Sequence, residues 1–183
     1  GEVKHPRTGL AVPPHPLEGD PAEFAGEGDR RRLLADWMGS PNNRFVPRML
    51  LDLQNRGQLA AGFTTYNPTR LRLLDTHKQI GNVIEAFRIS HEGKFESIMK
   101  TYAGRAAIGH VRYATCGAND RNYAQPFERH HGCKWKWFSI AFNGQLANFT
   151  DLRDQLLNLS NYHLTRNLDT EVIMHYLSYE LRK

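Results

Sequence analysis

Residues 106–113 read Ala-Ala-Ile-Gly-His-Val-Arg-Tyr, a short apolar run that ends in polar side chains. A run of this length without helical spacing is typical of a buried strand. The polar residues His110 and Arg112 come at its end, where a rigid scaffold can present functional groups to a site. We therefore expect a central strand over residues 106–113 that delivers side chains to a functional site.

The rest of the chain mixes expected helices and strands without a regular alternation, and residues 1–43 are predicted to be an irregular, Pro/Gly-rich arm with one short helix. One helical face carries Val46, Met49, Leu50 and Leu53 and should be buried. We expect helices over residues 45–53, from a cap at Asn148 or Thr150 through Leu159, and from Asp169 onward. We expect strands over 60–66, 71–74 and 137–142, and helical or mixed structure over 80–87 and 95–102. No glycine-rich nucleotide-binding motif occurs, so the nucleotide-binding classes are disfavoured.

Composition bounds the class of protein. The 183 residues are 40% hydrophobic and 23% charged, which suits one globular core. No apolar run approaches the roughly 18 residues that indicate a membrane span, and the first residues lack a secretion signal. Cys116 and Cys133 are too few for a disulfide framework. A soluble, cytoplasmic protein with no membrane partner is expected.

The net charge of +5 raises the question of a nucleic-acid partner. Residues 30–32 are three arginines, and residues 134–137 alternate lysine with tryptophan, as a phosphate-binding and base-stacking surface could. An arginine run is more often the solvated face of a helix, and tryptophan alternating with lysine more often marks a half-buried strand. Because no recognition motif accompanies the charge, nucleic acid is not an expected partner.

A zinc site is a second alternative, suggested by His130, His131 and Cys133. Neither a second cysteine pair nor a spaced pair of histidines completes a set of four ligands. We therefore expect these three residues to be unliganded loop residues, and we expect no metal and no cofactor.

Four polar clusters stand at the ends of expected elements, where a site can be built on a rigid scaffold. Each alone has an ordinary explanation: a surface arginine, a strand-end ion pair, a β-turn and a helix cap. The clusters are Arg56-Gly57-Gln58, residues 110–115, Asn143-Gly144 and Asp169-Thr170-Glu171.

The order of these clusters and the residues that they contain resemble the glutaminase domain of class II glutamine amidotransferases, especially the type fused to amidophosphoribosyltransferase. That resemblance implies an α+β fold, a four-layer αββα sandwich of antiparallel sheets as in N-terminal-nucleophile hydrolases. It makes residues 44–183 a partial amidotransferase domain, incomplete at both ends. The segments that carry it are residues 51–62, 109–115, 124–127, 141–148 with 152–153, and 169–172.

The resemblance also implies a role for each site residue. Free glutamine carries an α-carboxylate and an α-ammonium, which suit a planar guanidinium and a carboxylate. By resemblance, Arg112 holds the carboxylate with help from Thr115, and Asp169 holds the ammonium. The side-chain NH₂ of Asn143 and the backbone N–H of Gly144 form the oxyanion hole, which stabilises the tetrahedral intermediate. Arg56 supports the loops of the site.

The implied function is hydrolysis of the glutamine side-chain amide to glutamate and ammonia, which passes to an acceptor in a synthase domain or subunit. That acceptor is not identified, because no sugar-phosphate-binding sequence is present. The family nucleophile is a cysteine at the first position of the mature chain, where its own α-amine acts as the base.

The sequence departs from the family at this nucleophile, because it begins with Gly1. Cys116 and Cys133 are internal and have no α-amine beside them, so Cys116 either lines the pocket or is a buried bystander. We expect a fragment or one partner of a split or processed protein. The alternative is a catalytically inactive scaffold or regulatory subunit. Asn55 and Phe142 also replace family histidines.

Overall fold

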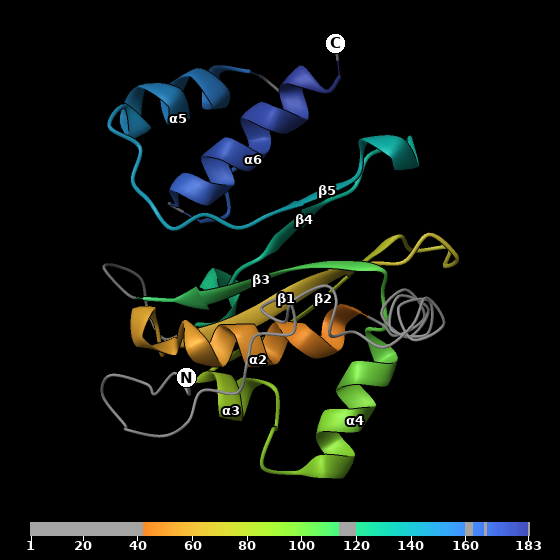
Figure 1. The fold of residues 1–183 in the computed structure, drawn as a ribbon. Coiled ribbons are helices and arrows are strands. Elements are labelled where there is room, and N and C mark those ends of the chain that lie inside the picture. The colour runs from red at the N-terminus through yellow and green to blue at the C-terminus, as the bar shows by residue number, and fades with distance from the viewer. Residues whose placement is uncertain (1–41, 114–119, 160–162, 167, 183) are drawn as a thin grey trace, which may run out of the picture. The chain divides into compact units, whose positions relative to one another are not determined.

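The computed structural model describes residues 42–113, 120–159, 163–166 and 168–182 (Figure 1). These residues form antiparallel sheets and helices, a mixed α and β fold in line with the expected α+β class. The arm and short helix expected over residues 1–43 lie almost wholly outside the described ranges, so that division of the chain stays a prediction.

Three antiparallel strands form the larger sheet, in the order β2-β1-β3. They are β1 (Ala60–Tyr66), β2 (Leu74–Ile80) and β3 (Ala106–Arg112). The strand expected over residues 60–66 is therefore confirmed, and so is a strand within residues 106–113. Its central position is wrong, because among the described strands β1 lies in the middle and β3 lies at an edge.

The second strand begins later than expected, at Leu74 rather than at Leu71. Hydrogen bonds of the backbone and side chain of Asn67 hold residues 67–73 as a loop instead. The N–H of Asn67 donates to the carbonyl of Leu73 at 2.8 Å, and its side-chain oxygen accepts from the N–H of Thr69 at 3.1 Å. Asparagine competes with strand pairing in this way because its amide mimics a backbone turn.

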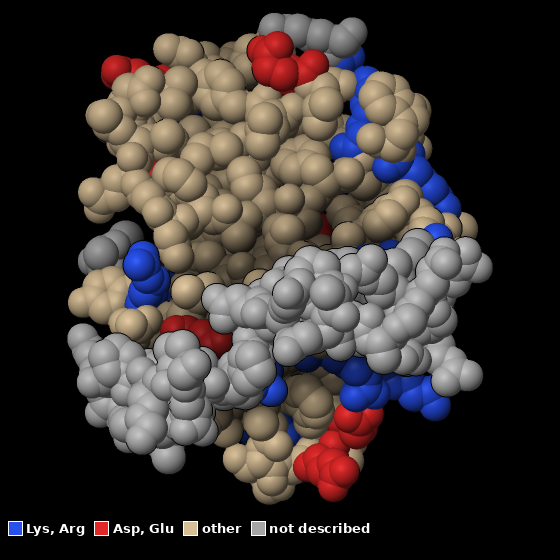
Figure 2. All heavy atoms as spheres, in the orientation of Figure 1, with Lys and Arg blue, Asp and Glu red and all other residues tan. Residues whose placement is uncertain are grey.

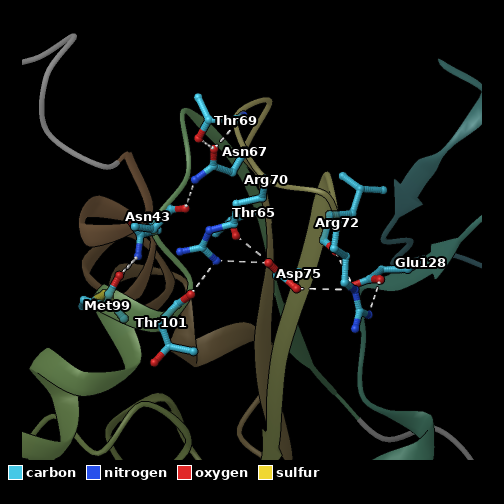
Figure 3. A network of polar contacts seen from close by, with 12 residues as sticks. Asn43, Thr65, Asn67, Thr69, Arg70, Arg72, Asp75, Met99, Thr101 and Glu128 are labelled. Carbon is cyan, nitrogen blue, oxygen red and sulfur yellow. Dashed lines mark hydrogen bonds and ion pairs between the residues drawn. The ribbon is translucent and has the colours of Figure 1, made fainter. Parts of the chain in front are cut away.

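Charged side chains tie this loop to its surroundings (Figure 3). Arg70 donates to the Asp75 carboxylate at 3.1 Å and to the carbonyl of Thr101 at 2.7 Å. Arg72 contacts Asp75 at 3.4 Å and Glu128 at 3.0 Å. The loop is thereby joined both to the helix that ends at Thr101 and to the strand that contains Glu128.

One face of the larger sheet is covered by helices α2 (Phe45–Asp52), α3 (Val83–Ala86) and α4 (Glu92–Thr101). Phe63 of β1 is fully buried at the centre, with its ring 5.1 Å from that of Phe87 and edge-on to Tyr102 at 5.8 Å. Such aromatic pairs stabilise a core beyond the area that they bury. The core therefore lies between this face and the three helices.

The apolar face of α2 is narrower than its sequence suggests. Val46 and Leu50 are buried against the sheet, as expected. Met49 and Leu53 are 61% and 47% exposed, so their expected burial is wrong. Pro47 is buried in their place, which shows that the buried stripe is turned toward residue 47.

The opposite face of the sheet meets a two-stranded sheet of β4 (Phe127–Arg129) and β5 (Phe138–Ile140). The contact is polar: the Ser139 hydroxyl donates to Thr64 at 2.9 Å, and Thr64 bonds Thr76 at 2.6 Å. Two further helices complete the described chain, α5 (Phe149–Asn158) and α6 (Asp169–Glu180). Helix α6 packs on both α5 and β4.

The lysine and tryptophan segment is not the half-buried strand expected from its alternation. Lys134–Lys136 forms a 3₁₀ turn, and Trp135 is 77% exposed. The Lys136 ammonium lies 4.8 Å from the centre of the Trp135 ring, so the pair is a local cation–π contact. The indole N–H of Trp137 donates to the carbonyl of His131 at 2.6 Å, which fixes the position of the Trp137 side chain.

Figure 2 shows the charges on one side of the protein. Basic side chains gather along the right margin of this side, with others at the left and in the lower part, and acidic ones occur at separate places. The arginines at 30–32 lie outside the described residues. Within the described ranges, no helix is long and apolar enough to cross a membrane.

The fit of α2 on β3 depends on Gly109. A Cβ at this position would lie 2.6 Å from Cγ1 of Val46 and 3.1 Å from Cδ1 of Leu50. Gly109→Ala should therefore lower the free energy of unfolding by about 1–3 kcal/mol, the usual result of overpacking a core. Gly93→Ala is the matched control, because nothing lies within 4 Å of its added Cβ, and inside α4 it should stabilise by up to about 1 kcal/mol. Urea denaturation of both variants measures this, and equal effects would contradict the close approach.

Stability should fall in mild acid because of His77. Its Nε2 donates to the carbonyl of Ala86 at 2.8 Å, and burial among aromatic rings lowers its pKa from the ordinary 6.5. The unfolded chain then takes up the proton first, so stability is complete above about pH 6.5 and is lost as the pH falls through the lowered pKa. Chemical unfolding from pH 7.5 to 5.5 measures the slope. His77→Gln keeps a hydrogen-bond donor but cannot ionise. The slope of the unfolding free energy against pH should therefore decrease by the equivalent of up to about one bound proton. An unchanged slope would contradict the role of His77.

Candidate active site

The end of β3 brings two polar side chains to one place. His110 and Arg112 are two residues apart, so both point to the same face of the sheet, opposite to Val111, which enters the core. They are 6% and 7% exposed. Across the strand they pair with Gly62 and Ala60, whose small size leaves room for imidazole and guanidinium.

A glycine lets the preceding loop approach this strand end. An added Cβ at Gly57 would lie 2.5 Å from the carbonyl carbon of Arg112 and 2.7 Å from the N of Tyr113. The backbone carbonyl of Arg112 also accepts from the N–H of Leu59 at 3.2 Å. Gly57 is needed for this close contact, which also places the exposed Arg56 beside the site.

Asn143-Gly144 follows β5 and leads toward α5. In the described chain it does not join two paired strands, so the simple hairpin turn that this dipeptide suggests is wrong. Gln125 holds the residue before it: its Oε1 accepts from the N–H of Phe142 at 2.7 Å, and its Nε2 donates to the Phe142 carbonyl at 3.2 Å. The backbone N–H and carbonyl of Phe142 are therefore bonded to the side chain of Gln125 and not to a neighbouring strand. This is why β5 ends at Ile140 and does not extend to residue 142.

Asp169 is the first residue of α6, where the helix dipole favours a carboxylate. Its Oδ1 accepts from the N–H of Leu146 at 2.9 Å. This bond ties the segment after Gly144 to the start of the helix. Asp169 and Asn143, 26 positions apart in sequence, are thereby brought to one site.

Glu171 anchors the loop that leads into α6. It is 2% exposed and accepts from the N–H and the hydroxyl of Thr165 at 3.0 and 2.7 Å and from the N–H of Arg166 at 2.6 Å. The Arg166 guanidinium lies 3.7 Å away. A buried carboxylate with this many donors fixes the position of the loop and therefore of Asp169.

One cleft of about 620 Å³ brings the expected site residues together. Arg56, Arg112, Asn143, Gly144 and Asp169 all line it, although they come from four separated stretches of the chain. The cleft therefore offers fixed cations, one fixed carboxylate and amide donors. Thr115 and Cys116 lie outside the described residues, so the roles suggested for them stay predictions.

The site also contains a neutral, buried imidazole. His110 Nε2 lies 2.8 Å from Oδ1 of Asn143. Burial is the largest cause that lowers the His110 pKa, the charge of Arg112 adds to it, and the bond to Asn143 opposes it. Burial and the charge of Arg112 thus both favour the neutral form of the His110 ring.

His110 and Gln125 had no role assigned from the sequence, although both occur in the segments that carry the resemblance. A polar residue inside an otherwise small or apolar run was the available signal, because a buried polar group needs a partner. The histidines of the alternative zinc site have other contacts: His130 bonds Glu128 at 2.9 Å, and His131 lies 3.4 Å from the hydroxyl of Ser178. Among the described residues, no group of three or more His, Cys, Asp or Glu could hold a metal.

The family profile described as "Glutamine amidotransferase domain" matches residues 74–180, more than half of the chain. The chain belongs to the glutamine amidotransferase domain family. This confirms the resemblance inferred from the polar clusters. The match begins at β2 and ends with α6, so it includes β3, the Asn143-Gly144 segment and Asp169.

Curated relatives agree with this assignment. The chain is 34% identical over 145 residues to an amidophosphoribosyltransferase of Pasteurella multocida and 34% identical to one of Homo sapiens, in matches that cover 78% and 76% of this chain. It is 36% identical over 141 residues to amidophosphoribosyltransferase 1, chloroplastic, of Arabidopsis thaliana, with 76% of this chain covered. The chain spans about a quarter of the length of these relatives, 23–26%.

A solved structure agrees as well. Glutamine phosphoribosylpyrophosphate amidotransferase from B. subtilis, complexed with ADP and GMP, superposes with a TM-score of 0.59 at 31% identity. The superposition covers 74% of this chain and 26% of that protein. The amidotransferase domain of this chain thus shares its fold as well as its sequence with these enzymes.

Glu171→Gln should destabilise the domain by about 2–3 kcal/mol. In the wild type both carboxylate oxygens accept hydrogen bonds, whereas the amide NH₂ of glutamine would face a backbone or hydroxyl donor and leave it without an acceptor. Thermal or urea unfolding measures this. Asp154→Asn is the matched control on the exposed face of α5, where a surface ion pair contributes at most about 1 kcal/mol. Similar small effects of both substitutions would contradict the anchoring role of Glu171.

Proposed function

We propose that this amidotransferase domain binds free glutamine in the cleft and hydrolyses its side-chain amide to glutamate and ammonia. The observation that carries the proposal is the placement of Arg112, Asn143, Gly144 and Asp169 around one cleft. The similarity to three amidophosphoribosyltransferases supports the same reaction class.

Charge complementarity supports glutamine as the ligand. An amino acid presents a carboxylate and an ammonium on one carbon, and the cleft holds the buried guanidinium of Arg112 and the carboxylate of Asp169. A planar guanidinium binds a carboxylate through two parallel hydrogen bonds. Arg56 lies at the same cleft and has the supporting role implied by the resemblance. Thr115 would assist Arg112.

The reaction needs donors where negative charge develops. Attack on the amide carbon converts the carbonyl oxygen to an oxyanion, and we assign its stabilisation to the side-chain NH₂ of Asn143 and the N–H of Gly144. Removing one such donor typically raises the barrier by about 3 kcal/mol. The nucleophile in this class is an N-terminal cysteine whose α-amine takes the proton of its thiol. N-terminal sequencing and intact mass of the native protein identify its first residue.

We also propose that the ammonia passes to an acceptor in a synthase domain or subunit. The similarity to amidophosphoribosyltransferases supports this transfer. We further propose that the β2-β1-β3 sheet and the β4–β5 sheet are the two inner layers of an αββα sandwich. Contacts of α2 and α3 with the first sheet and of α6 with β4 support this arrangement.

The alternative is an inactive scaffold or regulatory subunit with the same fold. It is distinguished by a native N-terminus other than cysteine together with absent glutamine hydrolysis. A nucleic-acid-binding module remains a third possibility only if the protein binds an oligonucleotide tightly and with strong salt dependence.

Isothermal titration calorimetry tests glutamine binding directly. Arg112→Ala should weaken binding of L-glutamine by about 10- to 100-fold, since a charge-assisted bond is worth about 1.5–3 kcal/mol. Arg153→Ala, on the exposed face of α5, is the matched control and should bind as the wild type does. Unchanged affinity in Arg112→Ala would contradict the proposed site.

Asp169→Asn separates the two charges of the ligand. It should weaken L-glutamine but leave 4-carbamoylbutyrate, which lacks the ammonium group, almost unaffected. Calorimetry with both ligands measures the difference, expected to be about tenfold or more. An equal loss for both ligands would show that Asp169 acts on the fold of the cleft rather than on the ammonium.

A further inference from the structure

Asn143 can serve an oxyanion only in one of its two orientations. With Oδ1 turned to His110, its NH₂ is left to donate into the cleft. If the amide were flipped, its carbonyl oxygen would face the cleft and repel the developing negative charge. Whatever selects the orientation of this amide therefore decides whether the cleft stabilises an oxyanion.

We propose that His110 and Gln125 are positioning residues that together hold Asn143 with its NH₂ directed into the cleft. This inference rests on the proposed function, because it assigns a role within the same oxyanion hole. His110 acts on the side chain of Asn143, and Gln125 acts on the backbone immediately before it.

The tautomer of His110 selects the amide orientation. A ring with its hydrogen on Nε2 donates to Oδ1, whereas a ring with its hydrogen on Nδ1 presents a lone pair at Nε2 and would attract the NH₂ instead. Nδ1 of His110 is buried and has no hydrogen-bond partner among the described residues. A buried N–H without a partner is rarer than a buried acceptor without one, so the surroundings favour hydrogen on Nε2.

The doubly protonated ring is disfavoured by the same surroundings. It would bury a second N–H without a partner and place a positive charge next to Arg112. His110 therefore stays in the neutral Nε2–H form, and the orientation of Asn143 persists across neutral pH.

Gln125 fixes the backbone that carries Asn143. Its amide bonds both the N–H and the carbonyl of Phe142, which leaves this peptide segment little rotational freedom. Gln125 is itself only 8% exposed. Its own carbonyl oxygen would lie 2.6 Å from a Cβ at Gly62, the residue paired with His110, so the two positioning residues meet β1 at the same glycine.

Nuclear magnetic resonance of histidine-labelled protein reads the tautomer directly. Long-range ¹H–¹⁵N correlations of His110 at pH 7.5 should show hydrogen on Nε2 and a bare Nδ1. The opposite tautomer would overturn the proposal, because it would turn the NH₂ of Asn143 toward the ring. This measurement uses the wild-type protein and needs no turnover.

Two isosteres then test His110 in the native protein. His110→Gln places an amide N–H where Nε2 stood, whereas His110→Asn reaches only as far as Nδ1. For glutamine hydrolysis, His110→Asn should lower kcat roughly 100-fold with KM within about twofold, and His110→Gln should stay within about tenfold of wild-type kcat. Equal losses of kcat in both variants, or a loss confined to KM, would overturn the positioning role.

Gln125→Glu tests the second contact, because it keeps an acceptor for the Phe142 N–H but replaces the donor with a carboxylate oxygen that faces the Phe142 carbonyl. It should lower kcat at least tenfold with little change in KM, whereas Gln155→Glu on the exposed face of α5 should not. Unchanged kcat in Gln125→Glu would overturn its role.

Failure of the proposed function would look different from failure of this inference. Wild-type protein that neither binds nor hydrolyses glutamine would contradict the proposed function, and the tautomer measurement would still decide the orientation of Asn143.

Discussion

The pairing of β3 with β1 is the constraint on which the site depends. Its register sets Val111 against Ala61 in the core and turns His110 and Arg112 to the opposite face, across from Gly62 and Ala60. A slip by one residue would exchange these faces, burying the guanidinium in the core and turning Val111 to the cleft. The apolar packing of α2 on this strand therefore also holds the charges of the cleft in place.

Buried polar groups link the two sheets and the cleft into one arrangement. Thr64 bonds both Thr76 and Ser139, which joins the larger sheet to β5. The Lys78 ammonium donates to the carbonyl of Pro126 at 3.2 Å, and burial lowers its pKa to about 8. Because each of these groups loses water on folding, its contact restricts the positions that the sheets can adopt. Gln125 and Pro126, just before β4, are thereby held next to the site.

Glycines matter here through close approach rather than through unusual backbone angles. At Gly57 and Gly62 an added Cβ would meet backbone atoms, so no small movement of a side chain could relieve the contact. These two positions bring the loop before β1 onto the end of β3 and the Gln125 segment onto β1. Both approaches shape the cleft.

The sequence by itself determined two of the strands and the family, and through the family the class of fold, because short apolar or β-branched runs and ordered polar clusters are local signals. Residues 60–66 and the strand ending at Arg112 could be found in this way, and so could Arg112, Asn143 and Asp169 as candidates. Only the tertiary structure decided the start of β2, the exposure of Met49 and Trp135, and the contacts of His110 and Gln125. The contacts of Gln125 and His110 join residues far apart in the sequence, which no local pattern contains: Gln125 bonds Phe142, 17 positions ahead, and His110 bonds Asn143, 33 positions ahead. The loop before β2 is likewise tied by Arg70 to Thr101, 31 positions ahead, and the exposure of Met49 and Trp135 depends on how their elements pack against the rest of the chain.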